Sequence, residues 1–216
     1  MLLSHLRPAL RLPRAVRGAS RVSTLSSNPS IKVFQHPQNP KTYILTYLDT
    51  NPPKQSLAVG TTTSIPPSPK SFQGNPRFLS ILNEVLAKHA INDSGLQSQA
   101  QALASPGGFN FITARNHRGT GTGAGGASAS GGAGGAGVGG WVHLSDERNP
   151  PDFGRIAWPE DILGSVEVDG KGIIIGNYQS SGTYRILTNE GILGLSPFLR
   201  DKLISRLREE EKKMED

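Results

Sequence analysis

The stretch Lys41-Thr-Tyr-Ile-Leu-Thr-Tyr-Leu48 decides the fold class, because a strand here is followed by a segment of helical period. β-Branched and aromatic residues dominate these eight positions, and such residues favour an extended strand. The turn formers Asp49-Thr-Asn-Pro-Pro53 come next, and residues 56–63 supply a second, looser strand. We therefore predict a β-hairpin over residues 41–63.

A helix is predicted after this hairpin. Asn75-Pro76 combines an N-cap residue with a proline at the first helical position, where the missing N–H is not needed. The pattern that follows predicts an amphipathic helix over residues 76–90, and a weaker second helix over residues 96–104. The apolar residues at helical spacing are Phe78, Leu79, Leu82, Val85 and Leu86.

The C-terminal third of the chain predicts a three-strand meander. Residues 166–168 alternate in polarity, and Asp169-Gly170 is a strong hairpin turn. The return strand is predicted at Ile173–Ile175 and the third strand at Thr183–Thr188, while residues 141–144 begin a further strand.

A final helix is predicted from the cap Ser196 and Pro197. Its apolar stripe ends before Glu209–Lys213, which we expect to form a solvated, fraying end. The stripe consists of Leu199, Leu203, Ile204 and Leu207.

Residues 119–140 are almost wholly Gly, Ala, Ser and Thr, a composition that cannot bury enough apolar surface to offset the entropy of ordering. We expect a flexible linker there. Gly121, Gly123 and Gly126 fit the dinucleotide pattern G-x-G-x-x-G, but no strand precedes them and no helix opens after them. Cofactor binding by this tract is therefore not predicted.

These elements predict an α+β fold. It would consist of a small antiparallel sheet, formed by the hairpin plus the meander, with two or three helices and a disordered Gly-rich insertion. The halves on either side of the glycine tract are small, so they could complete one sheet and form one domain.

The positive charge of the chain is concentrated at its N-terminus. The chain carries 23 Lys plus Arg against 17 Asp plus Glu, yet residues 1–30 hold five arginines, several serines and no acid. An Arg-rich, Ser-rich and acid-free composition is typical of a mitochondrial transit peptide. We expect residues 1–30 to be such a leader, cleaved between Arg17 and Ser30; the alternative is a disordered basic arm that binds nucleic acid or anionic lipid.

The remainder divides into halves of opposite charge. Residues 31–118 form a basic hairpin-plus-helix module of net charge +5, and residues 141–216 form an acidic meander-plus-helix module of net charge −4. The two halves could attract each other.

Several kinds of chemistry are excluded by composition. The chain has no cysteine, which rules out disulfides, thiolate metal sites and cysteine nucleophiles. No apolar run approaches the roughly 20 residues that cross a bilayer, so we expect no transmembrane segment. A peripheral contact with the inner membrane remains compatible with the sequence.

The densest ionisable cluster supplies the candidate catalytic residues His143, Asp146, Asp152 and Arg155. The competing interpretation is a structural loop in which the carboxylates pair with Arg148 and Arg155 and cap turns. No second histidine lies at a metal-ligand spacing and no nucleophile elbow occurs, so we predict neither a metal nor a cofactor.

Import together with the absence of a catalytic motif favours a non-catalytic protein of the mitochondrial matrix. We expect an interaction or assembly factor whose partner is a protein or a large assembly, either a respiratory-chain complex or the mitoribosome. The first alternative is a small enzyme that uses the polar cluster of residues 143–155. The second is an RNA-binding protein that uses the basic 31–118 module.

Overall fold

The computed structural model describes residues 23–105, 139–152 and 155–215. They form three α-helices and small antiparallel sheets, which confirms the predicted α+β class. The expected leader is described only from Ser23 onward and the expected linker only from Gly139 onward, so the rest of both predictions lies outside the described residues.

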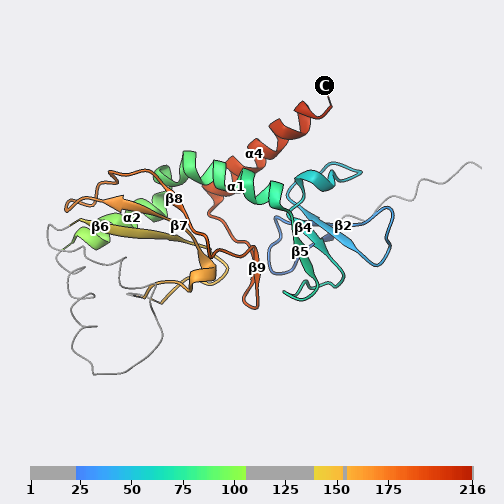
Figure 1. Ribbon diagram of the computed structural model, residues 1–216, viewed down its shortest axis with the longest axis horizontal. Coiled ribbons are helices and arrows are strands. Elements are labelled where there is room, and N and C mark those ends of the chain that lie inside the picture. Colours follow the sequence, from blue (N-terminus) through green and yellow to red (C-terminus); the bar gives the residue numbers. More distant parts are fainter. Residues whose placement is uncertain (1–22, 106–138, 153–154, 216) are drawn as a thin grey trace, which may run out of the picture.

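A five-stranded antiparallel sheet forms one end of the molecule (Figure 1). Each strand pairs with the next along the chain, and the predicted hairpin lies within it, with Tyr43 opposite Thr62. Two strands precede the hairpin, and the first begins inside the segment that the sequence assigns to the leader. The strands are β1 (Ser23–Thr24), β2 (Lys32–Gln35), β3 (Tyr43–Thr46), β4 (Gly60–Thr62) and β5 (Phe72–Gly74).

The helices begin where side-chain caps satisfy their first N–H groups. The Asn75 side chain accepts from the backbone N–H of Arg77 at the start of α1 (Pro76–His89). Asp93 caps α2 (Ser94–Ala104), and Ser196 caps α4 (Pro197–Lys213). The Ser196 hydroxyl also donates to Asp93 at 2.6 Å, so the caps of α2 and α4 are joined.

The second sheet has the order β6 (Gly140–Ser145), β7 (Ile162–Val168), β8 (Gln179–Ser180). Only the first strand of the predicted meander, residues 166–168, is in this sheet, as the end of β7. β6 contains the further strand predicted to begin at residues 141–144, and β8 was not predicted. Gly172 turns the chain at a φ of +79°, and residues 173–175 then run back beside β7 with one isolated bridge, between Ile174 and Val168, instead of a strand.

The predicted strand Thr183–Thr188 is also too long. Its first part contacts a 3-10 turn instead of a strand, since the Arg185 N–H donates to the carbonyl of Glu160. Only β9 (Leu187–Thr188) is a strand, and it pairs with β10 (Gly191–Ile192) in a separate two-stranded sheet. Short 3-10 turns complete the fold: η1 (Gln55–Leu57), η2 (Ala90–Asn92) and η3 (Pro159–Asp161).

One hydrophobic core joins the two halves of the chain, although their sheets stay separate among the described residues. Figure 1 shows α1 running between the two sheets with α4 packed beside it. The core contains Leu45 from the first sheet, Val59 directly before β4, Phe78 and Leu82 from α1, Val166 from the second sheet and Leu203 from α4.

In the described part of the chain, the helices are too short or too polar for any of them to span a bilayer.

Candidate functional site

Asp146 lies at the end of β6 and is completely buried. Its Oδ1 accepts from the backbone N–H groups of Arg148, at 2.9 Å, and Gly194, at 2.8 Å. Its Oδ2 accepts from the hydroxyl of Tyr184 at 2.8 Å. Both carboxylate oxygens are therefore occupied by groups of the protein itself.

Arg148 connects this aspartate to two other segments, residues 159–161 and residues 184–186, and its side chain is 3% exposed. Its Nε donates to Oδ1 of Asp161 at 2.8 Å. The two terminal nitrogens donate to the backbone carbonyls of Ile186 and Glu160, each at 2.9 Å. The guanidinium carbon also lies 5.4 Å from the centre of the Tyr184 ring. We call Asp146, Arg148, Asp161 and Tyr184 the buried polar network.

Burial dominates the protonation behaviour of the buried polar network. It raises the pKa of Asp146 above its usual range, against the opposing charge of Arg148 and the hydrogen bonds to the carboxylate. Burial, followed by the charge of Asp146, raises the pKa of Tyr184 well above its ordinary value. Tyr184 consequently stays protonated and acts as a hydrogen-bond donor.

His143 lies on β6, three residues before Asp146, and contacts a different neighbour. It stands opposite Ser165 on β7, and its Nδ1 lies 2.7 Å from the Ser165 hydroxyl oxygen. Burial lowers the pKa of His143, which favours a neutral ring able to accept the serine proton. Among the described residues, none makes a hydrogen bond with Nε2, so none of them serves as a third group that orients the ring.

Asp152 and Arg155 form a third, separate group. Their side chains are 84% and 77% exposed, and the shortest distance between the carboxylate and the guanidinium is 3.8 Å. Such an exposed pair contributes little to stability and touches neither His143 nor the buried polar network. The four candidate residues thus occupy three places and do not form one constellation.

The sequence missed two members of the buried polar network as partners of Asp146. Asp161 and Tyr184 come from η3 and from the segment before β9, and nothing in their spacing links them to Asp146. Arg148 was foreseen as a partner for the carboxylates, and its position two residues from Asp146 is the signal that finds it.

Two small cavities flank the segment Asp146–Arg148. One, of about 130 Å³, is lined by Asp93, Leu96 and Pro151 among others. The other, of about 200 Å³, is lined by residues that include Asn28 and Arg200. Both are smaller than the roughly 300–1,000 Å³ typical of ligand pockets. The described residues also bring no three His, Asp or Glu side chains into a metal-binding group.

The chain matches no model of a protein family, no curated protein and no solved structure.

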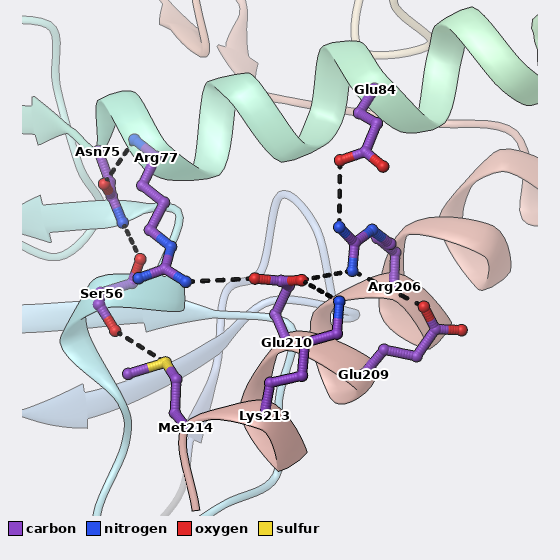
Figure 2. Close-up of polar contacts among 9 residues, drawn as sticks. All are labelled: Ser56, Asn75, Arg77, Glu84, Arg206, Glu209, Glu210, Lys213 and Met214. Carbon is purple, nitrogen blue, oxygen red and sulfur yellow. Dashed lines mark hydrogen bonds and ion pairs between the residues drawn. The ribbon is translucent and has the colours of Figure 1, made fainter. Parts of the chain in front are cut away.

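A second charged cluster joins α1 to α4 and is drawn in Figure 2. Glu210 accepts from Arg206 at 2.5 Å, from Lys213 at 2.9 Å and from Arg77 on α1 at 3.2 Å. Arg206 also donates to Glu84 of α1 at 3.2 Å. The predicted fraying end of the final helix is wrong, because these contacts hold α4 in helical form through Lys213.

Hydrogen bonds from Lys213 and then Arg206 and Arg77 lower the pKa of Glu210 to about 2. The contacts Arg77–Glu210 and Arg206–Glu84 cross between the basic and the acidic half of the chain, as does Lys54–Glu215 at 2.8 Å. The basic half supplies the cation in two of these pairs and the acidic half supplies it in Arg206–Glu84, so charged groups of both halves pair within the molecule.

Several large apolar side chains remain at the surface. Trp158, before η3, is 69% exposed, and Ile173 and Ile175, between β7 and β8, are 58% and 59% exposed. On the five-stranded half, Ile65 is 46% exposed. Exposed tryptophan and isoleucine side chains can bury area against another protein.

Proposed function

We propose that this chain is a non-catalytic protein of the mitochondrial matrix that acts as an interaction or assembly factor for a larger complex, either of the respiratory chain or of the mitoribosome. The proposed compartment is supported by the composition of residues 1–30, where five arginines and no acid occur.

The saturation of Asp146 carries the non-catalytic part of the proposal. A general acid or base needs a proton site that a substrate can reach. Asp146 is buried, and its two carboxylate oxygens accept three hydrogen bonds. The side chain of Arg148 donates to Asp161 and to backbone carbonyls. These residues hold segments of the chain together, which is a structural use of charged groups.

The exposed apolar residues of the acidic half are the proposed contact points. Tryptophan is enriched among the residues that dominate binding at protein interfaces. Trp158 exposes more of its surface than any other large hydrophobic residue described, and Ile173 and Ile175 project from the same half. We expect a protein partner to cover one or both of these positions.

The test is affinity purification of the full chain, tagged at its C-terminus, from intact mitochondria. We compare the wild type with Trp158→Ser, with the double variant Ile173→Ser/Ile175→Ser, and with Ile65→Ser as a control of matched chemistry. We expect a defined set of ribosomal or respiratory-complex proteins that Ile65→Ser retains and at least one of the other variants loses. A wild-type chain that purifies alone contradicts the proposal.

One contact favours an enzyme as the second candidate function. The His143 ring nitrogen lies within hydrogen-bond reach of the Ser165 hydroxyl, as a base lies beside a nucleophile. Ser165→Ala removes that hydroxyl without touching the buried polar network. If cells that carry Ser165→Ala show a mitochondrial growth defect while the variant still captures its partners, the enzyme hypothesis is favoured. If these cells grow like the wild type, the enzyme hypothesis is excluded.

The RNA-binding alternative receives less support. Of the six basic residues described between positions 31 and 105, four form ion pairs within the chain: Lys32 with Asp49, Lys54 with Glu215, Arg77 with Glu210 and Lys88 with Glu84. RNA affinity that falls steeply as salt is raised would restore this alternative.

A further inference from the structure

The segment Ser23–Ile31 is built into the five-stranded sheet. Ser23 stands opposite Val33 and Thr24 opposite Lys32, so β1 is an edge strand of that sheet. A backbone hydrogen bond of 3.0 Å from the Leu25 N–H to the Ile31 carbonyl closes the turn between β1 and β2. The backbone groups of this segment therefore make the hydrogen bonds of a β-strand and of a turn.

The side chains of this segment also belong to the core. Leu25 is 2% exposed and Ile31 is completely buried, and both lie in the hydrophobic cluster that joins the two halves. The Asn28 side chain donates to the carbonyl of Leu193, 165 residues away, at 2.7 Å. The beginning of the described chain is thus anchored to the C-terminal half as well as to its own sheet.

Two independent boundaries fall at nearly the same place. The basic residues that characterise the leader end at Arg21, and the next charged residue is Lys32. The strand β1, which pairs with β2, begins at Ser23. The last arginine of the leader therefore lies two residues before β1, although composition alone extends the leader to residue 30.

We infer that a matrix protease removes the leader by cutting a single peptide bond between Arg17 and Ser23, so that Ser23–Ile31 belongs to the mature protein. This inference rests on the import that the proposed function assumes. Water adds across the bond, giving a new carboxyl group on the leader and a new amino terminus on the mature chain. A cut after Leu25 would discard β1 and a buried core residue.

The first experiment identifies the N-terminus of the organellar protein. The full precursor is expressed, mitochondria are isolated, and the N-terminal peptide is sequenced by mass spectrometry. We expect the first residue to lie between positions 18 and 23. A first residue at positions 24–31 overturns the inference and leaves import standing, whereas an intact Met1 overturns import and the inference together; any other first residue also overturns the inference.

The second experiment tests whether Leu25 serves the fold. The substitutions Leu25→Asp and Ser26→Asp are made separately in the full precursor and introduce the same charge at neighbouring positions. Leu25 is buried, whereas Ser26 is exposed. We expect both precursors to be cut at the same bond. When protease is added to lysed mitochondria, the matrix form of Leu25→Asp should be digested about tenfold faster or more than that of Ser26→Asp, because digestion follows the opening of the folded chain. Equal digestion of the two variants overturns the inference.

Discussion

Arg148 holds distant segments of the chain together through one side chain. It contacts Asp161 and the carbonyl of Ile186, and its guanidinium lies close to Asp146 and Tyr184. A buried cation in this setting is balanced by the two carboxylates around it, so removing it leaves negative charges inside the protein without compensation.

We predict that Arg148→Met lowers the free energy of unfolding by about 3–5 kcal/mol, because one partner of a buried ionic group is lost. The measurement is urea unfolding of the full chain at neutral pH. Arg155→Met is the matched control, since the side chain of Arg155 is 77% exposed, and it should change stability by no more than about 0.5 kcal/mol. Equal effects of the two substitutions would contradict a structural role for the buried polar network.

Glu210 makes stability depend on pH in the acid range. Its pKa falls from an ordinary value of 4.5 to about 2 in the folded protein, so folding favours the charged form. Its stabilising contribution is complete above pH 4.5 and is lost as the pH falls toward 2. Asp146 acts in the opposite direction, because its raised pKa makes protonation easier in the folded state than in the unfolded one.

We predict that Glu210→Gln loses less stability than the wild type between pH 4.5 and about 2, as measured by thermal unfolding at a series of pH values. Glu209→Gln is the control, because Glu209 is 64% exposed and approaches Arg206 only to 3.7 Å. A control variant with the same altered pH profile as Glu210→Gln would show that the effect does not come from the contacts of Glu210.

At the scale of elements, close approach between strands depends on particular glycines. Gly164 on β7 lies under the ring of Tyr178, whose hydroxyl donates to the carbonyl of Leu163 at 2.7 Å. A Cβ at Gly164 would stand 2.4 Å from the carbonyl oxygen of Gln179 and from the Tyr178 ring. Neither the backbone nor the hydrogen-bonded ring can move away without breaking the pairing of β7 with β8.

We predict that Gly164→Ala lowers the free energy of unfolding by about 1–3 kcal/mol through overpacking. Gly182→Ala is the control, because a Cβ there meets nothing within 4 Å. That variant should be as stable as the wild type or slightly more so, since alanine narrows the unfolded ensemble. Chemical unfolding followed by circular dichroism measures both changes.

The elements that the sequence predicted well carry their signals locally. Asn75-Pro76 and Ser196-Pro197 mark the starts of α1 and α4, because a cap and the proline after it act within one turn of helix. The hairpin of β3 and β4 follows from β-branched residues on either side of turn formers. Each of these predictions needed only neighbouring residues.

The elements that were missed depend on partners far along the chain. β1 was missed because the serines near Ser23 resemble a leader, and only its pairing with β2, where Ser23 stands opposite Val33, makes it a strand. The isoleucines at 173–175 have high strand propensity, yet Ile173 and Ile175 point to solvent. The buried polar network could not be predicted for the same reason. Asp161 and Tyr184 are distant from Asp146 in the sequence and come close to it only in the folded chain.

At the scale of the whole molecule, the continuous core predicts a single unfolding transition. Both tryptophans, Trp141 and Trp158, lie in the C-terminal half, so their fluorescence reports on that half. Leu45 lies in the five-stranded sheet of the other half and is completely buried. Because one cluster of side chains contains residues of both halves, damage to one half should destabilise the other.

We predict that fluorescence and circular dichroism give coincident transitions, and that Leu45→Ala lowers stability by about 2–5 kcal/mol when measured by tryptophan fluorescence. Gln38→Ala, on an exposed turn of the same half, is the control and should leave the fluorescence midpoint in place. A fluorescence midpoint that Leu45→Ala does not move would mean that the halves unfold independently.

The helix α2 and the start of β6 both lie beside the hairpin that brings Val168 opposite Ile174. Gly172 packs against Ala100 and Gln101 of α2, and Gly139 packs against the carbonyl of Val168 on the other arm of that hairpin. The described elements on either side of residues 106–138, the helix α2 and the start of β6, therefore lie next to each other. A molecule severed in this stretch would consist of two fragments with complementary halves of one core, and each fragment would need the other in order to fold. The two halves of the chain thus pack against each other as the subunits of a heterodimer do, although one polypeptide contains both.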